Sequence, residues 1–153
     1  MKAIHNVSAI HDNVLKVWKH ADGTLFQPTD PEIMSYSRWA GGRSSNQSVS
    51  LRSFLHDNAD KEGIYMVYLK WSEEDTAHVT ILERDKGGNY IYYDPQSGKK
   101  NWLSKWEAKV DLSRCFMMRI DDKLINEDCA AAFVRAGRIR PRPTIGTCFR
   151  QGR

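Results

Sequence analysis

The chain has 153 residues, 41% of them hydrophobic and 10% aromatic, which is enough for one buried core and too little for two ordinary domains. No stretch approaches the roughly 18 uncharged apolar residues of a spanning helix, and polar residues interrupt the N-terminal segment where a signal peptide would be apolar. Three cysteines without CxxC spacing indicate neither a disulfide framework nor a zinc site. We expect one soluble, cytoplasmic domain with no membrane contact and no metal or cofactor.

The net charge of +4 is concentrated at the C-terminal end. Residues 129–153 contain six arginines and no acid, which leaves residues 1–128 at −2. A proline-bearing arginine run more often solvates a chain end or contacts an acidic partner than reads bases. We therefore predict a domain over 1–134 and a basic tail over 135–153, and we disfavour nucleic-acid binding. The six residues are Arg135, Arg138, Arg140, Arg142, Arg150 and Arg153.

Helical signals dominate the first 60 residues. Apolar residues at spacings of three and four predict an amphipathic helix over 7–20. Turn-forming residues over 22–44 indicate a connecting loop. A second helix is predicted over 45–59, with Ser45 or Asn46 as its cap and a buried stripe that should pack on a sheet. That stripe consists of Val49, Leu51, Phe54 and Leu55.

After Gly63 the apolar pattern becomes strand-like. β-Branched and aromatic residues alternate in four segments, which we interpret as a mostly antiparallel sheet. A short helix is expected over 99–110, and a final helix is expected over 129–136 with Asn126 and Asp128 as its cap. Two helices followed by such a sheet indicate the α+β class. The predicted strands are 64–71, 78–84, 90–94 and 113–121.

One hairpin brings two polar residues together. A three-residue loop over 86–88, with a glycine at the bulge position, would pair Asp85 with Asn89. Counting outward then places Thr80 opposite Asp94 and His78 opposite Gln96, so that His78 and Asp94 are diagonal neighbours on one face. A two-residue loop would put them on opposite faces.

This pair suits nucleophilic catalysis. A neutral imidazole is an effective base near pH 7 when a carboxylate fixes its tautomer and orientation. His78 would then deprotonate a thiol or hydroxyl, Asp94 would orient it, and the Gln96 side-chain amide could donate to an oxyanion. The alternative is that His78 is a polar residue at a strand start and that Asp94 with Pro95 ends a strand.

Residues 50–126 resemble the papain-like toxin domain of the glutamine-deamidase type found in bacterial polymorphic toxins and phage head-associated proteins. The resemblance rests on Ala77-His78-Val79, on Asp94-Pro95-Gln96 after a tyrosine-rich strand, on the Ser97-Gly98 turn and on the run from Arg119 to Asp122. It implies a papain-like fold in which His78 is the base and Asp94 the orienting acid. It also implies a hydrolase acting on a target protein, as a bacterial or phage effector delivered into a target cell.

The nucleophile of that family is a cysteine on a helix upstream of the histidine, and this sequence has no cysteine before Cys115. Three explanations remain: the chain is a fragment, the domain has become a binding module, or the nucleophile lies elsewhere. Cys129 is the candidate for the third, because the first turn of a helix lowers a thiol pKa. Cys129 could equally be a small buried thiol in the core. We predict that Cys115 is a core residue and that Cys148 is a surface thiol.

Two functions are therefore expected from the sequence. The first is a cysteine amidohydrolase that deamidates a glutamine of a target protein without a cofactor. The second is an inactive papain-like module that binds a protein partner through the same cleft and the arginine tail.

Overall fold

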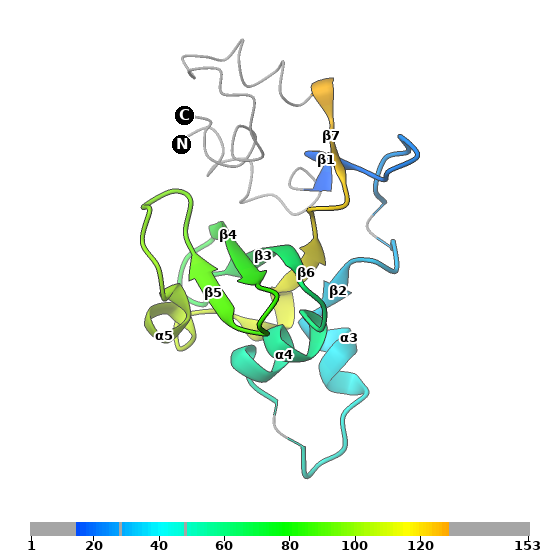
Figure 1. Ribbon diagram of the computed structural model, residues 1–153. Helices are drawn as coiled ribbons and strands as arrows, with labels where there is room; N and C mark the ends of the chain where they lie inside the picture. Colours follow the sequence, from blue (N-terminus) through cyan, green and yellow to red (C-terminus); the bar gives the residue numbers. More distant parts are fainter. Residues whose placement is uncertain (1–14, 28, 48, 129–153) are drawn as a thin grey trace.

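A computed structural model describes residues 15–128 except 28 and 48, and its central feature is a five-stranded antiparallel sheet (Figure 1). The strand order is β2-β6-β3-β4-β5, and each neighbouring pair is antiparallel. The chain therefore belongs to the α+β class, as predicted. The strands are β2 (Met34–Ser35), β3 (Gly63–Lys70), β4 (Ala77–Arg84), β5 (Tyr90–Tyr93) and β6 (Phe116–Arg119).

Both faces of the central strands are buried, which explains their continuous apolar sequence. Along β3, Tyr65, Val67 and Leu69 enter one hydrophobic cluster, whereas Met66 and Tyr68 enter the cluster on the other face. This alternation is the two-residue period of a strand. The four longer strands confirm the four predicted segments, although β6 is shorter than 113–121 because Leu112–Arg114 forms the 3-10 helix η1.

Three helices cover one face of this sheet. These are α3 (Tyr36–Gly41), α4 (Leu51–Asn58) and α5 (Trp102–Trp106). The second helix buries Leu51, Phe54 and Leu55 against the same cluster that contains Leu82 of β4. Figure 1 shows α3 and α4 below the sheet and α5 beside β5. The predicted packing of the second helix on the sheet is confirmed.

The second helix begins later than predicted. Ser50 is its N-cap: the Ser50 side chain accepts from Ser53 N, and the Ser53 hydroxyl accepts from Ser50 N, forming a capping box. Ser45 and Asn46 therefore lie outside the helix, and Val49 is 52% exposed instead of buried. Ser50 directly precedes Leu51, the first buried residue of the helix, which explains why the helix begins there and not at the earlier Ser and Asn residues.

The predicted loop over 22–44 is partly wrong, because it contains β2 and α3. Ser35 caps α3 by accepting from Arg38 N, and β2 pairs with β6 at Met34 and Met117. Tyr36 of α3 packs edge-on against Phe54 of α4 with ring centroids 5.4 Å apart. Contacts with segments distant in sequence thus order a stretch whose local composition favours turns.

The predicted helix over 7–20 is wrong in its last residues. Trp18 and Lys19 form strand β1 (Trp18–Lys19), which pairs with β7 (Leu124–Ile125) in a separate two-stranded sheet. Trp18 is completely buried. Pairing with a segment a hundred residues away overrides the helical spacing there, and residues 7–14 lie outside the described part. No helix in the described part is long and apolar enough to cross a membrane.

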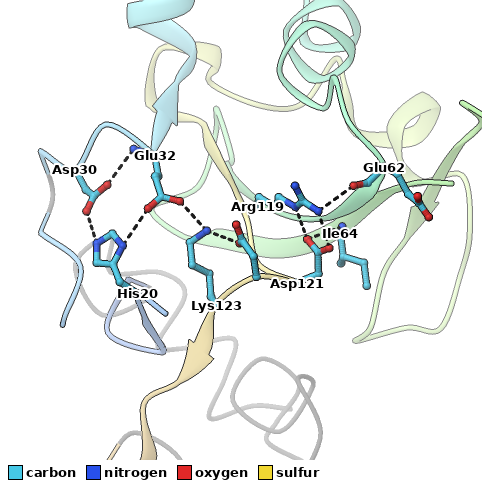
Figure 2. A network of polar contacts seen from close by, with 9 residues as sticks. His20, Asp30, Glu32, Glu62, Ile64, Arg119, Asp121 and Lys123 are labelled. Atoms are coloured by element: carbon cyan, nitrogen blue, oxygen red, sulfur yellow. Dashed lines mark hydrogen bonds and ion pairs between the residues drawn. The ribbon is translucent and has the colours of Figure 1, made fainter. Parts of the chain in front are cut away.

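Polar networks tie the N-terminal segment and the β6–β7 connection to the sheet (Figure 2). The Lys123 Nζ, buried among its partners, lies 2.8 Å from Glu32 Oε1, while His20 contacts the carboxylates of Asp30 and Glu32. Arg119 pairs with Asp121 at 2.7 Å and donates to the carbonyl of Glu62. The second network closes around Gly63, where an added Cβ would lie 2.8 Å from Arg119 Nε.

We therefore expect Gly63→Ala to lower the free energy of unfolding by about 1 kcal/mol or more. The added methyl group would displace the guanidinium of Arg119, which is hydrogen-bonded to both Asp121 and the carbonyl of Glu62. Gly41→Ala is the matched control, since nothing lies within 4 Å of its added Cβ. Its stability should be unchanged or raised by up to about 1 kcal/mol. Urea unfolding of both variants measures the difference, and equal effects would contradict the steric argument.

Candidate functional site

The hairpin between β4 and β5 has the predicted three-residue loop. Asp85 N donates to Asn89 O at 3.0 Å, and Arg84 pairs with Tyr90. Gly88 takes a positive φ of 83°, the left-handed conformation that a bulged three-residue loop requires. The register predicted from the sequence is thus confirmed through the ladder, which ends where Ile81 pairs with Tyr93.

This register brings His78 and Asp94 together. His78 Nε2 lies 2.7 Å from Asp94 Oδ1, and the two residues are 5% and 2% exposed. Because an ionised carboxylate can only accept, the proton at this contact belongs to Nε2. The neutral ring then has Nδ1 as its basic nitrogen. The predicted neighbour relation is therefore present, and it is buried.

A tight turn after β5 saturates the carboxylate of Asp94. Oδ1 also accepts from Gln96 N at 3.3 Å, and Oδ2 accepts from Ser97 N at 3.1 Å and from Ser97 Oγ at 2.6 Å. Gly98, at a φ of 74°, closes the turn by donating to Asp94 O. Burial raises the pKa of Asp94, but the bonds from His78, Ser97 and Gln96 outweigh it and hold the pKa below its ordinary value.

Gln96 does not occupy the ladder position opposite His78 that the sequence predicted. The chain leaves the strand after Tyr93, so Gln96 lies in the turn and is exposed. Its main-chain N–H is bonded to Asp94. Ser97 is a contributor to the site that the sequence left without a role, although a serine three residues after an aspartate at a strand end is a recognisable turn signal.

Two indoles enclose the His78 ring. Trp106, at the end of α5, meets it edge-on at 5.1 Å, and Trp71, just after β3, lies at 6.2 Å between ring centroids. Trp102 anchors α5 by donating from its Nε1 to the carbonyl of Ile81 at 2.9 Å. The sequence placed these tryptophans in elements but gave them no role. For Trp102 and Trp106, the signal was their spacing with Leu103 along one side of the predicted short helix.

A pocket of about 600 Å³ is lined by Trp71 and Trp106, the two indoles that contact His78. Trp71 and Trp106 form its aromatic part, and the β3–β4 loop contributes Glu73 and Glu74. His78 itself is not among the lining residues. The indoles therefore stand between the histidine and an open concave surface.

A second histidine, on helix α4, contacts the helix-covered face of the sheet. His56 of α4 stacks on Tyr90 with ring centroids 3.9 Å apart and is hydrogen-bonded to the hydroxyl of Tyr92. Burial and the nearby charges of Arg52 and Arg84 lower the pKa of His56. Tyr90 and Tyr92 lie on the His78 face of the sheet, because they pair with Arg84 and Leu82, and both contact α4 through His56.

The described cysteine has the properties of a core residue. Cys115 is 1% exposed, its Sγ lies 3.3 Å from the carbonyl of Asp111, and burial raises its pKa to about 12. A thiol in this state is a poor nucleophile. Cys129 and Cys148, with the predicted final helix and the arginine tail, lie outside the described residues. At the predicted cap of that helix, Asn126 Oδ1 accepts from Asp128 N at 3.1 Å.

One cluster has the composition of a metal site. Ligand atoms of His20, Asp30 and Glu32 lie within 4.8 Å of one another. However, the two ring nitrogens of His20 face different carboxylates, and Lys123 already neutralises Glu32. A metal ion would take only one ring nitrogen, so the geometry fits an ion-pair network better than a ligand set. Figure 2 shows the histidine ring between its two acids.

No family model, curated protein or solved structure matches this chain. The function is therefore inferred from the geometry of the site together with the sequence motifs at 77–79 and 94–98.

The depressed pKa of Asp94 predicts a specific acid dependence of stability. Its ionised form stabilises the fold above the ordinary value of 3.8, and this contribution is lost as the pH falls through the lower folded-state pKa. Asp94→Asn should cost about 1–3 kcal/mol at pH 7, and the difference from wild type should shrink at acid pH. Urea unfolding between pH 7 and pH 2 measures this, with Ser97→Ala as an intermediate case. A pH-independent difference would refute the assignment.

Thiol labelling should separate the cysteines. We expect Cys115 to react with iodoacetamide near neutral pH far more slowly than a free thiol, and to react rapidly only after unfolding. Peptide mapping of the labelled protein gives the rate at each cysteine. Labelling of Cys115 in the folded protein at the rate of a free thiol would contradict its burial and raised pKa.

Proposed function

We propose that this protein is a papain-like cysteine amidohydrolase that deamidates a glutamine side chain of a target protein. The observation that carries the proposal is the buried bond between His78 Nε2 and Asp94 Oδ1 at 2.7 Å. A carboxylate that fixes one ring nitrogen prepares the other as a base. The motif resemblance over residues 50–126 supplies the reaction class.

In the proposed reaction His78 Nδ1 accepts the proton of a cysteine thiol. The thiolate then attacks the amide carbon of glutamine, and the imidazolium returns the proton to the leaving nitrogen, so that ammonia departs and a thioester remains. Water, deprotonated by the same nitrogen, hydrolyses the thioester to glutamate and restores the thiol. Asp94 stabilises the imidazolium throughout, and Ser97 positions Asp94 through two hydrogen bonds.

The candidate nucleophile in this scheme is Cys129, because it lies in the first turn of the predicted final helix, whereas the thiol of Cys115 is buried and Cys148 belongs to the arginine tail. Because His78 Nε2 is bonded to Asp94, the thiol in this scheme approaches the other ring nitrogen, Nδ1. The side-chain amide of Gln96 remains the proposed oxyanion donor, since its main-chain N–H is already bonded to Asp94.

The second candidate is an inactive papain-like module that binds a protein partner. The family carries its nucleophilic cysteine upstream of the histidine, and this sequence has no cysteine before Cys115. That absence, together with the burial of Cys115, favours the binding module. In this case the bond between His78 and Asp94 would stabilise the hairpin and would have no catalytic role.

Ammonia release from a glutamine-rich protein such as casein tests the first candidate. His78→Ala should lower the rate by roughly a hundredfold or more, the usual contribution of a general base, and Cys129→Ser should abolish the reaction. His20→Asn is the histidine control, because His20 lies in the separate network of Figure 2 and should leave the rate unchanged. Wild-type protein without release, or equal release by His78→Ala, would favour the binding module.

A further inference from the structure

The pocket beside His78 has an aromatic corner. The rings of Trp71 and Trp106 meet nearly at right angles, with an interplanar angle of 83° and centroids 5.6 Å apart. Both residues are half-buried and line the pocket. Indole faces carry negative electrostatic potential and attract ammonium and guanidinium groups within about 6 Å.

Acidic side chains stand next to this corner. The β3–β4 loop holds three consecutive acids at 73–75, all exposed, and Glu73 and Glu74 line the pocket. Lys109 is the one cationic residue among the lining residues and is outnumbered by these two carboxylates. The lining of the pocket therefore combines two carboxylates and one ammonium with the aromatic corner, which suits a positively charged side chain.

Hydrogen bonds from Lys70 and Ser72 fix the β3–β4 loop that carries these acids. The buried ammonium of Lys70 donates to the carbonyl of Trp71 at 3.0 Å and to that of Glu74 at 2.5 Å. Ser72 is also fixed, because its N and Oγ both donate to Lys109 O. These bonds preorganise the acidic loop against the end of α5, and a preorganised pocket loses less entropy when a ligand binds.

We infer that this pocket binds an arginine or lysine side chain of the polypeptide that presents its glutamine to His78. The indoles that form the pocket also contact the His78 ring, so a basic residue held there would lie close in sequence to the reacting glutamine. The interpretation as a substrate subsite rests on the proposed deamidase function. Binding of a cationic side chain requires only the pocket.

Two short peptides test the inference with the full chain. Each has one glutamine in a Gly/Ser/Ala background, and one carries arginine where the other carries glutamate. The arginine peptide should bind more tightly, as measured by isothermal titration calorimetry, and added salt should weaken its binding. The double variant Glu73→Gln/Glu74→Gln should bind it roughly five-fold more weakly. Trp71→Leu, checked for folding by circular dichroism, should also weaken binding by removing an aromatic face.

The charge-matched control is Asp60→Asn/Glu62→Gln, which removes two exposed carboxylates at the other end of β3. Its affinity for the arginine peptide should equal that of wild type. Equal affinity of wild type for the two peptides, absence of binding at millimolar peptide, or equal losses in the two double variants would overturn the inference. Arginine-selective binding without ammonia release would support the pocket and count against the deamidase activity, whereas release without arginine preference would do the reverse.

Discussion

The register of the β4–β5 hairpin determines whether His78 and Asp94 can meet. Their side chains share a face because the loop between Asp85 and Asn89 has three residues, with Gly88 in the left-handed conformation. A slip of one residue would send the two side chains to opposite faces of the sheet. The helices, the two indoles and the outer pocket are then arranged around a pair that this short loop has already aligned.

Burial of an ionised carboxylate is unfavourable unless hydrogen bonds satisfy its oxygens. Asp94 meets this condition with four donors, one from His78 and three from the turn residues Gln96 and Ser97. The turn therefore does more than end a strand: it keeps the carboxylate ionised where burial would favour protonation. The same device maintains the negative charge that an imidazolium at His78 would need.

The candidate site and the Arg119–Asp121 ion pair occupy opposite ends of the central strand β3. Trp71 and the acidic loop follow its last residue, whereas Arg119 and Asp121 surround its first residue, Gly63. The helix-covered face between them is continuous, with Tyr65, Val67 and Leu69 in one cluster. This arrangement allows the charged loop beside His78 to face solvent while the core that supports it stays apolar.

The amino-acid sequence by itself determined the α+β class, the four main strands, the α4 and α5 helices and the pairing of His78 with Asp94, because each depends on local periodicity or on counting residues around one loop. Tertiary contacts decided the rest. Trp18 and Lys19 form a strand because β7 is available to pair with them, and α3 forms within a turn-rich segment because Tyr36 packs on Phe54. The pocket lined by Trp71 and Trp106 likewise depends on how α5 packs against β4 and the β3–β4 loop. Periodicity along the chain carries no information about such partners, since it describes each segment alone.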